Sequence, residues 1–293
     1  MSGTPALTYP EDLRSLVEEA LEKLRFPAGP ATAGLEEAMR YSLLAGGKRV
    51  RPVLTLATAR AVGADPEHYL QAATSIELIH TYSLIHDDLP AMDDDDLRRG
   101  QPTAHVKFGE DIAILAGDGL FAEAIRLFCE QRGDPALVLA ALRELAAATG
   151  VDGMVGGQYA DVTGEAGDAE ALRNVHALKT GRLIAAGVGV VLTLTGLPEH
   201  EKMPYRRFAE ELGVLFQIVD DILDVTGSDE ELGKPRGSDE RHGKLTYVSL
   251  FGLERARELA AESHARATEA LAEADGETGD LRGVADYIFT RNE

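Results

Sequence analysis

Six aspartates gather in one short stretch, Asp87–Asp88 and Asp93–Asp96, and two arginines, Arg98 and Arg99, follow directly. Carboxylates in this number repel one another unless a cation lies between them, and hard divalent cations such as Mg2+ take oxygen ligands while keeping several waters. Guanidinium groups match phosphate oxygens in a two-pronged way. The stretch therefore predicts a metal-assisted diphosphate site, although many acidic runs are only solvated loops.

The residues around the first aspartate pair argue against a merely solvated loop. The pair follows His86 at the end of an apolar run, residues 75–85, which is typical of a buried helix. Pro90 cannot continue a regular helix. On an unbroken helix, with about 3.6 residues per turn, Asp87 and Asp93 would point to nearly opposite sides. We therefore expect the break to bring these two carboxylates together.

A second acidic group ends another apolar segment, Phe216–Asp224. Asp220 and Asp224 are four residues apart and so share one helical face, with Asp221 beside them. Like charges at this spacing destabilise a helix slightly. One Asp-Asp-x-x-Asp pattern is weak evidence of a site, but two acidic groups that each end an apolar helix are much stronger evidence.

A basic loop, Gly46–Pro52, precedes both acidic groups and contains Lys48, Arg49 and Arg51. Its two glycines allow a left-handed turn or a close approach of the backbone, and Pro52 is typical of the start of a helix. A basic helix cap would also explain the pattern. We favour a second anion site, because the first acidic group already indicates diphosphate chemistry.

The composition indicates an all-α protein with a full apolar core. The chain has 293 residues, of which 44% are hydrophobic and only 5% aromatic, with no tryptophan. The core must therefore consist mostly of Leu, Ala, Val and Ile, and Ala and Leu favour helices most strongly. We expect one domain over residues 1–293, with residues 1–10 as a loose tail.

Charge and cysteine content limit the partners and the compartment. The formal net charge of −21 argues against nucleic acid and against anionic membranes, which attract basic surfaces. Cys129 is the only cysteine, so no intrachain disulfide is expected, as in a reducing cytosol. The N-terminus lacks a signal-peptide pattern, and the apolar run 183–197 is too short to span a membrane. We expect a cytoplasmic protein without a membrane span.

Helical periodicity predicts most of the chain as helix. Residues 153–158 are glycine-rich, which indicates close helix packing or approach to a ligand. The expected helices are 11–24, 34–44, a helix opened by Pro52, 66–85, 111–131, 135–149, 154–162, 169–196, 205–225, 253–272 and 281–289.

Taken together, these patterns make the chain similar to the trans-type polyprenyl diphosphate synthases, and most similar to bacterial farnesyl diphosphate synthases. Asp87–Asp93 resembles the first aspartate-rich motif of that family, in the form with two extra residues, and Asp220–Asp224 resembles the second. The resemblance covers residues 35–291. It implies a bundle of ten or more helices around a central cavity, and a homodimer.

The resemblance also implies a reaction and its site residues. Isopentenyl diphosphate would be condensed with dimethylallyl or geranyl diphosphate, with three Mg2+ ions (Mn2+ could replace them). The metal ligands would be Asp87, Asp88, Asp93, Asp220 and Asp224, with Asp221 in support. The catalytic residues would be Asp87, Asp93, Lys179, Thr180, Gln217 and Asp220. Isopentenyl diphosphate would be bound by Gly47, Lys48, Arg51, His80 and Arg99, and the allylic diphosphate by Arg98, Lys179, Thr180, Gln217, Lys234 and Lys244.

Tyr82 and Ser83, five and four residues before Asp87, would limit the growing chain to fifteen carbons, and the polar stretch 227–243 would form a lid. Simpler explanations are a packed core tyrosine at Tyr82, a core histidine at His80 and a snorkelling lysine at Lys179.

Three alternatives to a farnesyl diphosphate synthase stay open. One is a geranylgeranyl diphosphate synthase, another is a terpene cyclase, which needs no second diphosphate site, and the third is a non-catalytic partner subunit, which would have lost an acidic motif.

Overall fold

The computed structural model describes residues 8–165, 168–227 and 244–291, and it is all-α apart from one two-stranded hairpin. This confirms the predicted fold class of ten or more helices. The N-terminal elements are α1 (Glu11–Lys23), α2 (Ala33–Leu43), α3 (Val50–Ala61), η1 (Pro66–Tyr69), α4 (Leu70–Asp87), β1 (Leu97–Arg98), β2 (Gln101–Pro102), α5 (Ala104–Phe108), α6 (Glu110–Cys129) and α7 (Pro135–Thr149). The C-terminal elements are α8 (Met154–Val162), α9 (Ala169–His176), the π-helical turn η2 (Ala177–Gly181), α10 (Arg182–Leu194), α11 (Glu199–Thr226), α14 (Tyr247–Phe251), α15 (Leu253–Ala272) and α16 (Gly279–Thr290).

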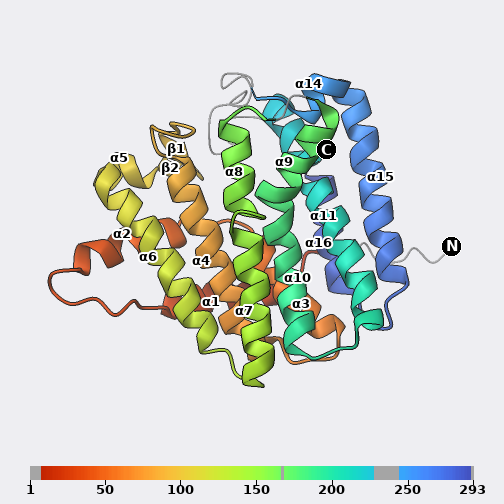
Figure 1. The fold of residues 1–293 in the computed structure, drawn as a ribbon, viewed down its shortest axis with the longest axis horizontal. Coiled ribbons are helices and arrows are strands. Elements are labelled where there is room, and N and C mark those ends of the chain that lie inside the picture. Colours follow the sequence, from red (N-terminus) through yellow and green to blue (C-terminus); the bar gives the residue numbers. More distant parts are fainter. Residues whose placement is uncertain (1–7, 166–167, 228–243, 292–293) are drawn as a thin grey trace.

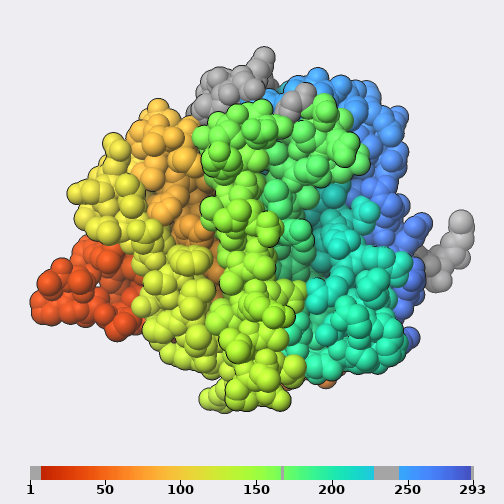
Figure 2. All heavy atoms as spheres, viewed as in Figure 1, coloured from red at the N-terminus to blue at the C-terminus, as the bar shows by residue number. Residues whose placement is uncertain are grey.

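The long helices run side by side as a bundle, with the hairpin β1–β2 at one end (Figure 1). Helix α4 packs against α6, α10 against α7 and α3, and α11 against α15. The segment around α2 protrudes from the body of the molecule (Figure 2). The core consists mainly of Leu, Ala, Val and Ile side chains, as the composition predicts. This scaffold holds the ends of α4 and α11, which carry the two acidic groups.

Helix α10 is a core helix. Together with α9 and η2 it forms one continuous helical segment, Ala169–Leu194, which within the described residues is long and apolar enough by composition to span a bilayer. Half of its most apolar window is buried inside the protein, and α10 is covered by α3, α7 and α11. Burial against these three helices accounts for its apolar character.

Three expected helices differ from the structure. Residues 66–69 form a 3-10 turn before α4, because Pro66 fixes the first turn and Asp65 caps it. The expected helix 169–196 contains the π turn. The helix expected to start at 205 begins at Glu199 instead, because Pro204 removes only one hydrogen bond, at an end where His200 is exposed to water.

The chain is held in place before α1, within the stretch 1–10 that the sequence predicts to be a loose tail. Residues 1–7 lie outside the described part of the chain. Tyr9 is buried, and its hydroxyl donates a 2.6 Å hydrogen bond to the carbonyl of Lys48. The chain is thus anchored before α1 begins.

Candidate active site

A cavity of about 720 Å3 opens between the ends of α4 and α11. Most of the residues predicted to do chemistry line it, although they come from distant parts of the sequence. The predicted residues on its wall are Arg51, His80, Tyr82, Ser83, Asp87, Asp93, Arg98, Arg99, Lys179, Thr180, Gln217, Asp220, Asp221, Asp224 and Lys244. Gly47, Lys48 and Asp88 are not part of this wall, and Lys234 lies outside the described residues.

The first acidic group folds back on itself as the break at Pro90 predicts. The backbone N–H of Asp93 donates to the carbonyl of Asp87 across the turn, at 2.9 Å. Burial raises the pKa of Asp87 to about 6; nearby Lys179 opposes this shift and Asp93 adds to it. The two carboxylates therefore share one side of the cavity. A cation placed beside Asp87 would stabilise its charged form, which burial disfavours.

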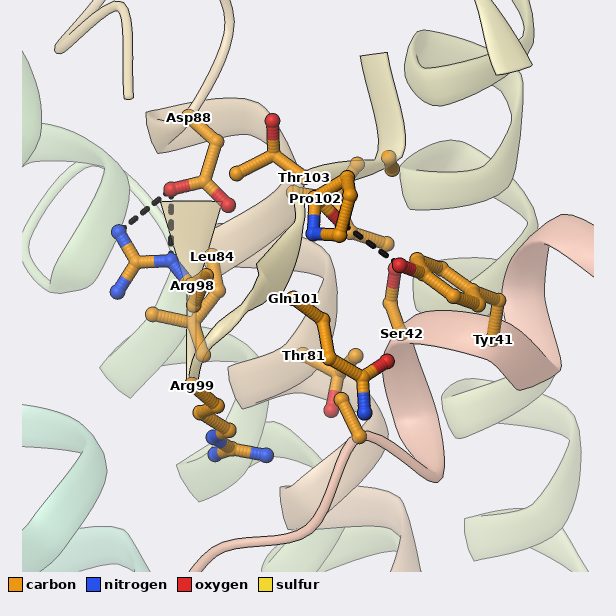
Figure 3. Close-up of a pocket in the computed structure, with 13 residues that line it drawn as sticks. Tyr41, Ser42, Thr81, Leu84, Asp88, Arg98, Arg99, Gln101, Pro102 and Thr103 are labelled. Atoms are coloured by element: carbon orange, nitrogen blue, oxygen red, sulfur yellow. Dashed lines mark hydrogen bonds and ion pairs between the residues drawn. The ribbon is translucent and has the colours of Figure 1, made fainter. Parts of the chain in front are cut away.

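Asp88 turns away from the cavity and holds Arg98. The Arg98 Nε donates to Asp88 Oδ1 at 2.6 Å, and Arg99 extends in a different direction (Figure 3). These residues line a much smaller pocket of about 30 Å3, which is room for little more than one water. The structure thus brings Asp87 and Asp93 together on the cavity wall, and it places Asp88 where it orients an arginine.

The second acidic group lies on α11, with its three carboxylates in different settings. Asp220 is mostly exposed, whereas Asp221 and Asp224 are buried. Asp221 accepts hydrogen bonds from the Gln217 amide at 2.9 Å and from the backbone N–H of Tyr247 at 2.7 Å. Asp221 therefore fixes Gln217 and the start of α14.

Two lysines pair with carboxylates on the cavity wall. Lys244 Nζ lies 2.8 Å from Asp93 Oδ1, and Lys179 Nζ lies 2.7 Å from Asp161 Oδ2. Lys244 also approaches Asp161, at 3.5 Å. Burial alone would raise the pKa of Asp161, but the two lysines outweigh it and hold the pKa below its usual value. These ammonium groups converge where an anionic ligand would meet the acidic groups.

Lys179 and Thr180 lie on the π turn, which is held between two glycines. A Cβ at Gly157 of α8 would lie 2.2 Å from the backbone nitrogen of Lys179, and one at Gly213 of α11 would lie 2.8 Å from the Cα of Gly181. The Thr180 hydroxyl donates to Gln217 Oε1 at 3.0 Å. Single-turn π bulges are common at functional sites, and here close packing seats the turn against both neighbours.

Replacing Gly213 with alanine is expected to lower turnover about tenfold or more, because the turn that carries Lys179 and Thr180 would have to shift. The added methyl meets backbone, which cannot rotate away. Gly34→Ala on α2 is the matched control, since no atom lies within 4 Å of its Cβ position. Steady-state kinetics and thermal melting of both variants check this. Equal turnover in Gly213→Ala and Gly34→Ala would show that the turn can shift without loss of activity.

A cationic side, which we define as Arg51, His80, Arg99 and Arg291, lines another part of the cavity wall, and Arg291 Nη2 lies 3.6 Å from Asp220 Oδ1 of the second acidic group. Arg51 Nη1 lies 3.3 Å from His80 Nε2. Because arginine can only donate, His80 Nε2 accepts and the ring is neutral. Burial, reinforced by Arg51, holds the pKa of His80 well below its usual value, and burial lowers that of Arg51 to about 10. The guanidiniums of Arg51 and Arg291 lie over the ring of Phe216, at 5.4 and 4.3 Å.

The glycine pair of the basic loop makes room for Arg99. The Arg99 guanidinium donates to the Gly46 carbonyl, and it lies 2.9 Å from where a Cβ at Gly47 would be. Gly47 also has a backbone φ of +118°, which side chains disfavour. This is the close backbone approach that the sequence predicts. Lys48 is half exposed beside Tyr287 and is not part of the cavity wall.

Tyr82 lines the cavity one helical turn below the first acidic group. Its ring meets Phe121 of α6 edge-on, at 5.2 Å between centroids, and His86 at 5.6 Å. Burial raises its pKa to about 12, so the phenol stays neutral. An apolar chain that entered along α4 would meet this ring.

The sequence reading missed several wall residues, namely Gln158, Asp161, His176, Phe216 and Arg291. Neither amide atom of Gln158 has a hydrogen-bond partner among the described residues, although both are buried. The glycine-rich stretch 153–158 predicts close helix packing or approach to a ligand, and Gly157 packs closely against Lys179. Gln158 and Asp161 are three apart on one helical face, a signal that could have identified them. Arg291 had no such signal, because only the fold brings it to the cavity.

A model of the polyprenyl synthetase family matches residues 32–287, and the chain belongs to that family. It is a trans-prenyltransferase of all-α architecture. It is 48% identical over 264 residues to a chloroplastic geranylgeranyl pyrophosphate synthase of Capsicum annuum, covering 88% of this chain and 72% of that protein. It is 44% identical over 285 residues to farnesyl diphosphate synthase of Geobacillus stearothermophilus, covering 95% of both.

A solved structure agrees with the fold. A Helicobacter pylori geranyltransferase, crystallised with magnesium and isoprenyl diphosphate, matches with a TM-score of 0.87 and 32% identity, covering 99% of this chain and 98% of that one. The relatives thus include both fifteen- and twenty-carbon synthases.

Proposed function

We propose that the protein is a farnesyl diphosphate synthase, which joins isopentenyl diphosphate to dimethylallyl diphosphate and then to geranyl diphosphate. The observation that carries the proposal is the Tyr82 ring, which faces the cavity and packs on Phe121. Tyr82 is five residues before Asp87, about 7.5 Å along the helix axis. A chain growing from the aspartates along α4 would meet this ring, which supports a short product.

The carboxylates at the cavity mouth fit magnesium. Within the described residues no three acidic or imidazole groups form a ready-made cage. That fits Mg2+, which uses one or two carboxylates together with waters and substrate phosphates. Asp87, Asp93, Asp220 and Asp224 would hold the three expected ions (or Mn2+), with Asp88 orienting Arg98. When bound, the ions would supply positive charge that polarises the phosphate oxygens.

The first step breaks the bond between the allylic carbon and the diphosphate oxygen, and the electron pair leaves with the diphosphate. Lys179 and Lys244 exchange their present carboxylate partners for its oxygens and stabilise the charge that develops there. The Thr180 hydroxyl donates its hydrogen bond to Gln217, so the lone pairs of the hydroxyl oxygen are free to face the allylic cation. Gln217 keeps this orientation because its amide N–H groups are held by Asp221.

The second substrate supplies the electrons for the new bond. The cationic side, with Lys48 from the basic loop, would hold isopentenyl diphosphate so that its double bond faces the cation. That double bond forms the new carbon–carbon bond, and loss of a proton then restores a double bond. We assign this proton to the released diphosphate, since the acidic and basic motifs of the sequence contain no obvious side-chain base. Holding both partners in place supplies much of the acceleration.

The alternatives differ in chain length and in class. The Capsicum annuum relative favours a twenty-carbon product, which Tyr82 opposes. A terpene cyclase would not need the cationic side, and a non-catalytic subunit would not need both acidic groups.

Product analysis tests the proposal. Purified protein incubated with isopentenyl diphosphate, Mg2+ and either dimethylallyl or geranyl diphosphate is expected to give a fifteen-carbon diphosphate from both. A twenty-carbon product would support the proposed mechanism but overturn the proposed chain-length specificity. No condensation by folded protein would favour a cyclase or a partner subunit.

We also propose a single-domain, cytoplasmic homodimer. Support for the dimer comes from apolar side chains exposed on α7 and just after it, Leu139 at 67% and Val151 at 82%, which a second copy would cover. Plant relatives are chloroplastic proteins, so the compartment stays a prediction.

A further inference from the structure

Arg49 is a buried arginine in the basic loop that does not reach the cavity. Its side chain is fully buried, with 0% exposed. Its backbone is left-handed, with φ 53° and ψ 39°, at the residue that precedes α3. Non-glycine residues rarely adopt this conformation unless their surroundings hold them there. Contacts with neighbouring residues must therefore stabilise this backbone conformation of Arg49.

Three elements hold its guanidinium. Nη1 donates to Glu77 of α4 at 2.7 Å, Nε to Glu18 of α1 at 2.9 Å, and Nη2 to the Leu43 carbonyl at the end of α2 at 2.8 Å. Burial lowers the pKa of Arg49, but Glu77 and Glu18 outweigh it, so the group stays charged. Such a three-way arrangement fixes direction as well as distance, since guanidinium is planar.

Glu77 connects this arrangement to the cationic side. It is 1% exposed and lies three residues before His80 on α4, so the two side chains share a helical face. Arg51, two residues after Arg49, contacts His80. The Arg49–Glu77 pair therefore sets the position of the start of α3 relative to α4, and with it the relation of Arg51 to His80.

Helix α1 completes the arrangement from outside the segment matched by the family model, which begins at residue 32. Glu18 comes from α1. Tyr9, just before α1, donates to the carbonyl of Lys48 at 2.6 Å and packs on Tyr287, 4.8 Å between ring centroids. Two successive residues of the basic loop, Lys48 and Arg49, are thus held by the N-terminal segment.

We infer that helix α1 is a working part of the isopentenyl diphosphate site: Glu18 and Tyr9 act as positioning residues that hold Arg49 and Lys48, and so place Arg51 against His80. This inference rests on the proposed function, because it takes the cationic side as the place where isopentenyl diphosphate binds. It assigns a role to residues that touch no substrate. It also predicts that weakening α1 affects one substrate more than the other.

Glu18→Gln tests the inference with little change of shape. The variant is expected to raise the KM for isopentenyl diphosphate about tenfold, while the KM for geranyl diphosphate changes less than about twofold, because only one side of the cavity is loosened. Amide hydrogen exchange should speed up in residues 46–51. Glu19→Gln is the matched control, since within the described part of the chain Glu19 pairs only with exposed Lys23 on the same helix. Arg49→Lys, which cannot reach three partners at once, should show a larger effect of the same kind.

The outcomes separate the inference from the function on which it rests. Wild-type protein that fails to condense the two substrates would overturn the proposed function. Active wild-type protein with unchanged kinetics and exchange in Glu18→Gln would overturn the inference alone. Equal rises in both KM values, or a fall in melting temperature with no change in kinetics, would also overturn it, because they would show α1 to be only structural.

Discussion

Asp87→Asn is expected to lower turnover by about three orders of magnitude, because it removes one of the carboxylates that face the leaving diphosphate and its metal. Asparagine keeps the shape of the side chain, so the fold should survive. Steady-state kinetics with saturating Mg2+ measure the loss. Asp96→Asn is the matched control, since Asp96 belongs to the same acidic stretch but is exposed. Near-normal turnover in Asp87→Asn would remove Asp87 from the site.

The same variant is expected to stabilise the metal-free protein at neutral pH. The pKa of Asp87 is raised from 3.8 to about 6, so its charged form is less favourable in the folded protein than in the unfolded chain. This cost is absent below about pH 4, grows as the pH rises towards 6, and is complete above that. Allowing for partial exposure, it is about 1 to 3 kcal/mol.

Denaturant unfolding with a chelator, at about pH 5 and pH 7.5, checks the sign. Asp87→Asn should gain stability over the wild type at the higher pH and less at the lower one. Asp96→Asn should follow the wild type at both. A loss of stability at the higher pH would mean that the nearby lysines outweigh burial at Asp87.

Tyr82→Ala is expected to lengthen the main product by at least one five-carbon unit. Removing the ring opens the cavity where the growing chain would otherwise stop against Tyr82. Product chromatography with geranyl diphosphate as the allylic substrate measures the change. Tyr82→Phe is the control, since it keeps the ring and should keep the fifteen-carbon product.

Either result on Tyr82 is informative. An unchanged product in Tyr82→Ala would mean that a different part of the wall stops the chain. A longer product in Tyr82→Phe would show that the hydroxyl, rather than the ring, sets the limit. A wild-type product of twenty carbons would already rule out this role for the tyrosine.

Much of the fold and site could be predicted because they follow local rules. The apolar runs that end in Asp88 and Asp224 predict helices with acidic ends, and Pro90 predicts the turn that brings Asp93 back to Asp87. Gly47 predicts the close approach that Arg99 makes. Each of these signals depends on a few neighbouring residues.

The rest depends on contacts between distant segments. Arg291 reaches the cavity only because α16 packs against α3 and α11. The sequence predicts Asp88 to be a metal ligand beside Asp87, but in the structure its carboxylate accepts a hydrogen bond from Arg98. The helical pattern does not reveal the π turn, because α10, which follows it, is apolar on most of its faces and hides a one-residue shift in the periodicity. Gly157 and Gly213, which leave room for the turn, belong to other helices.

The π turn also constrains how this chain can vary. One additional residue in a turn rotates everything that follows by about 100° relative to what precedes it. The face of α9 that bears Leu172 and Val175, and the apolar face of α10, are therefore in register with the core only through this extra residue. Losing a single residue within 177–181 would turn α10 about its own axis and displace the side chains that it packs against α3, α7 and α11. This stretch of helix should therefore accept substitutions far more readily than insertions or deletions.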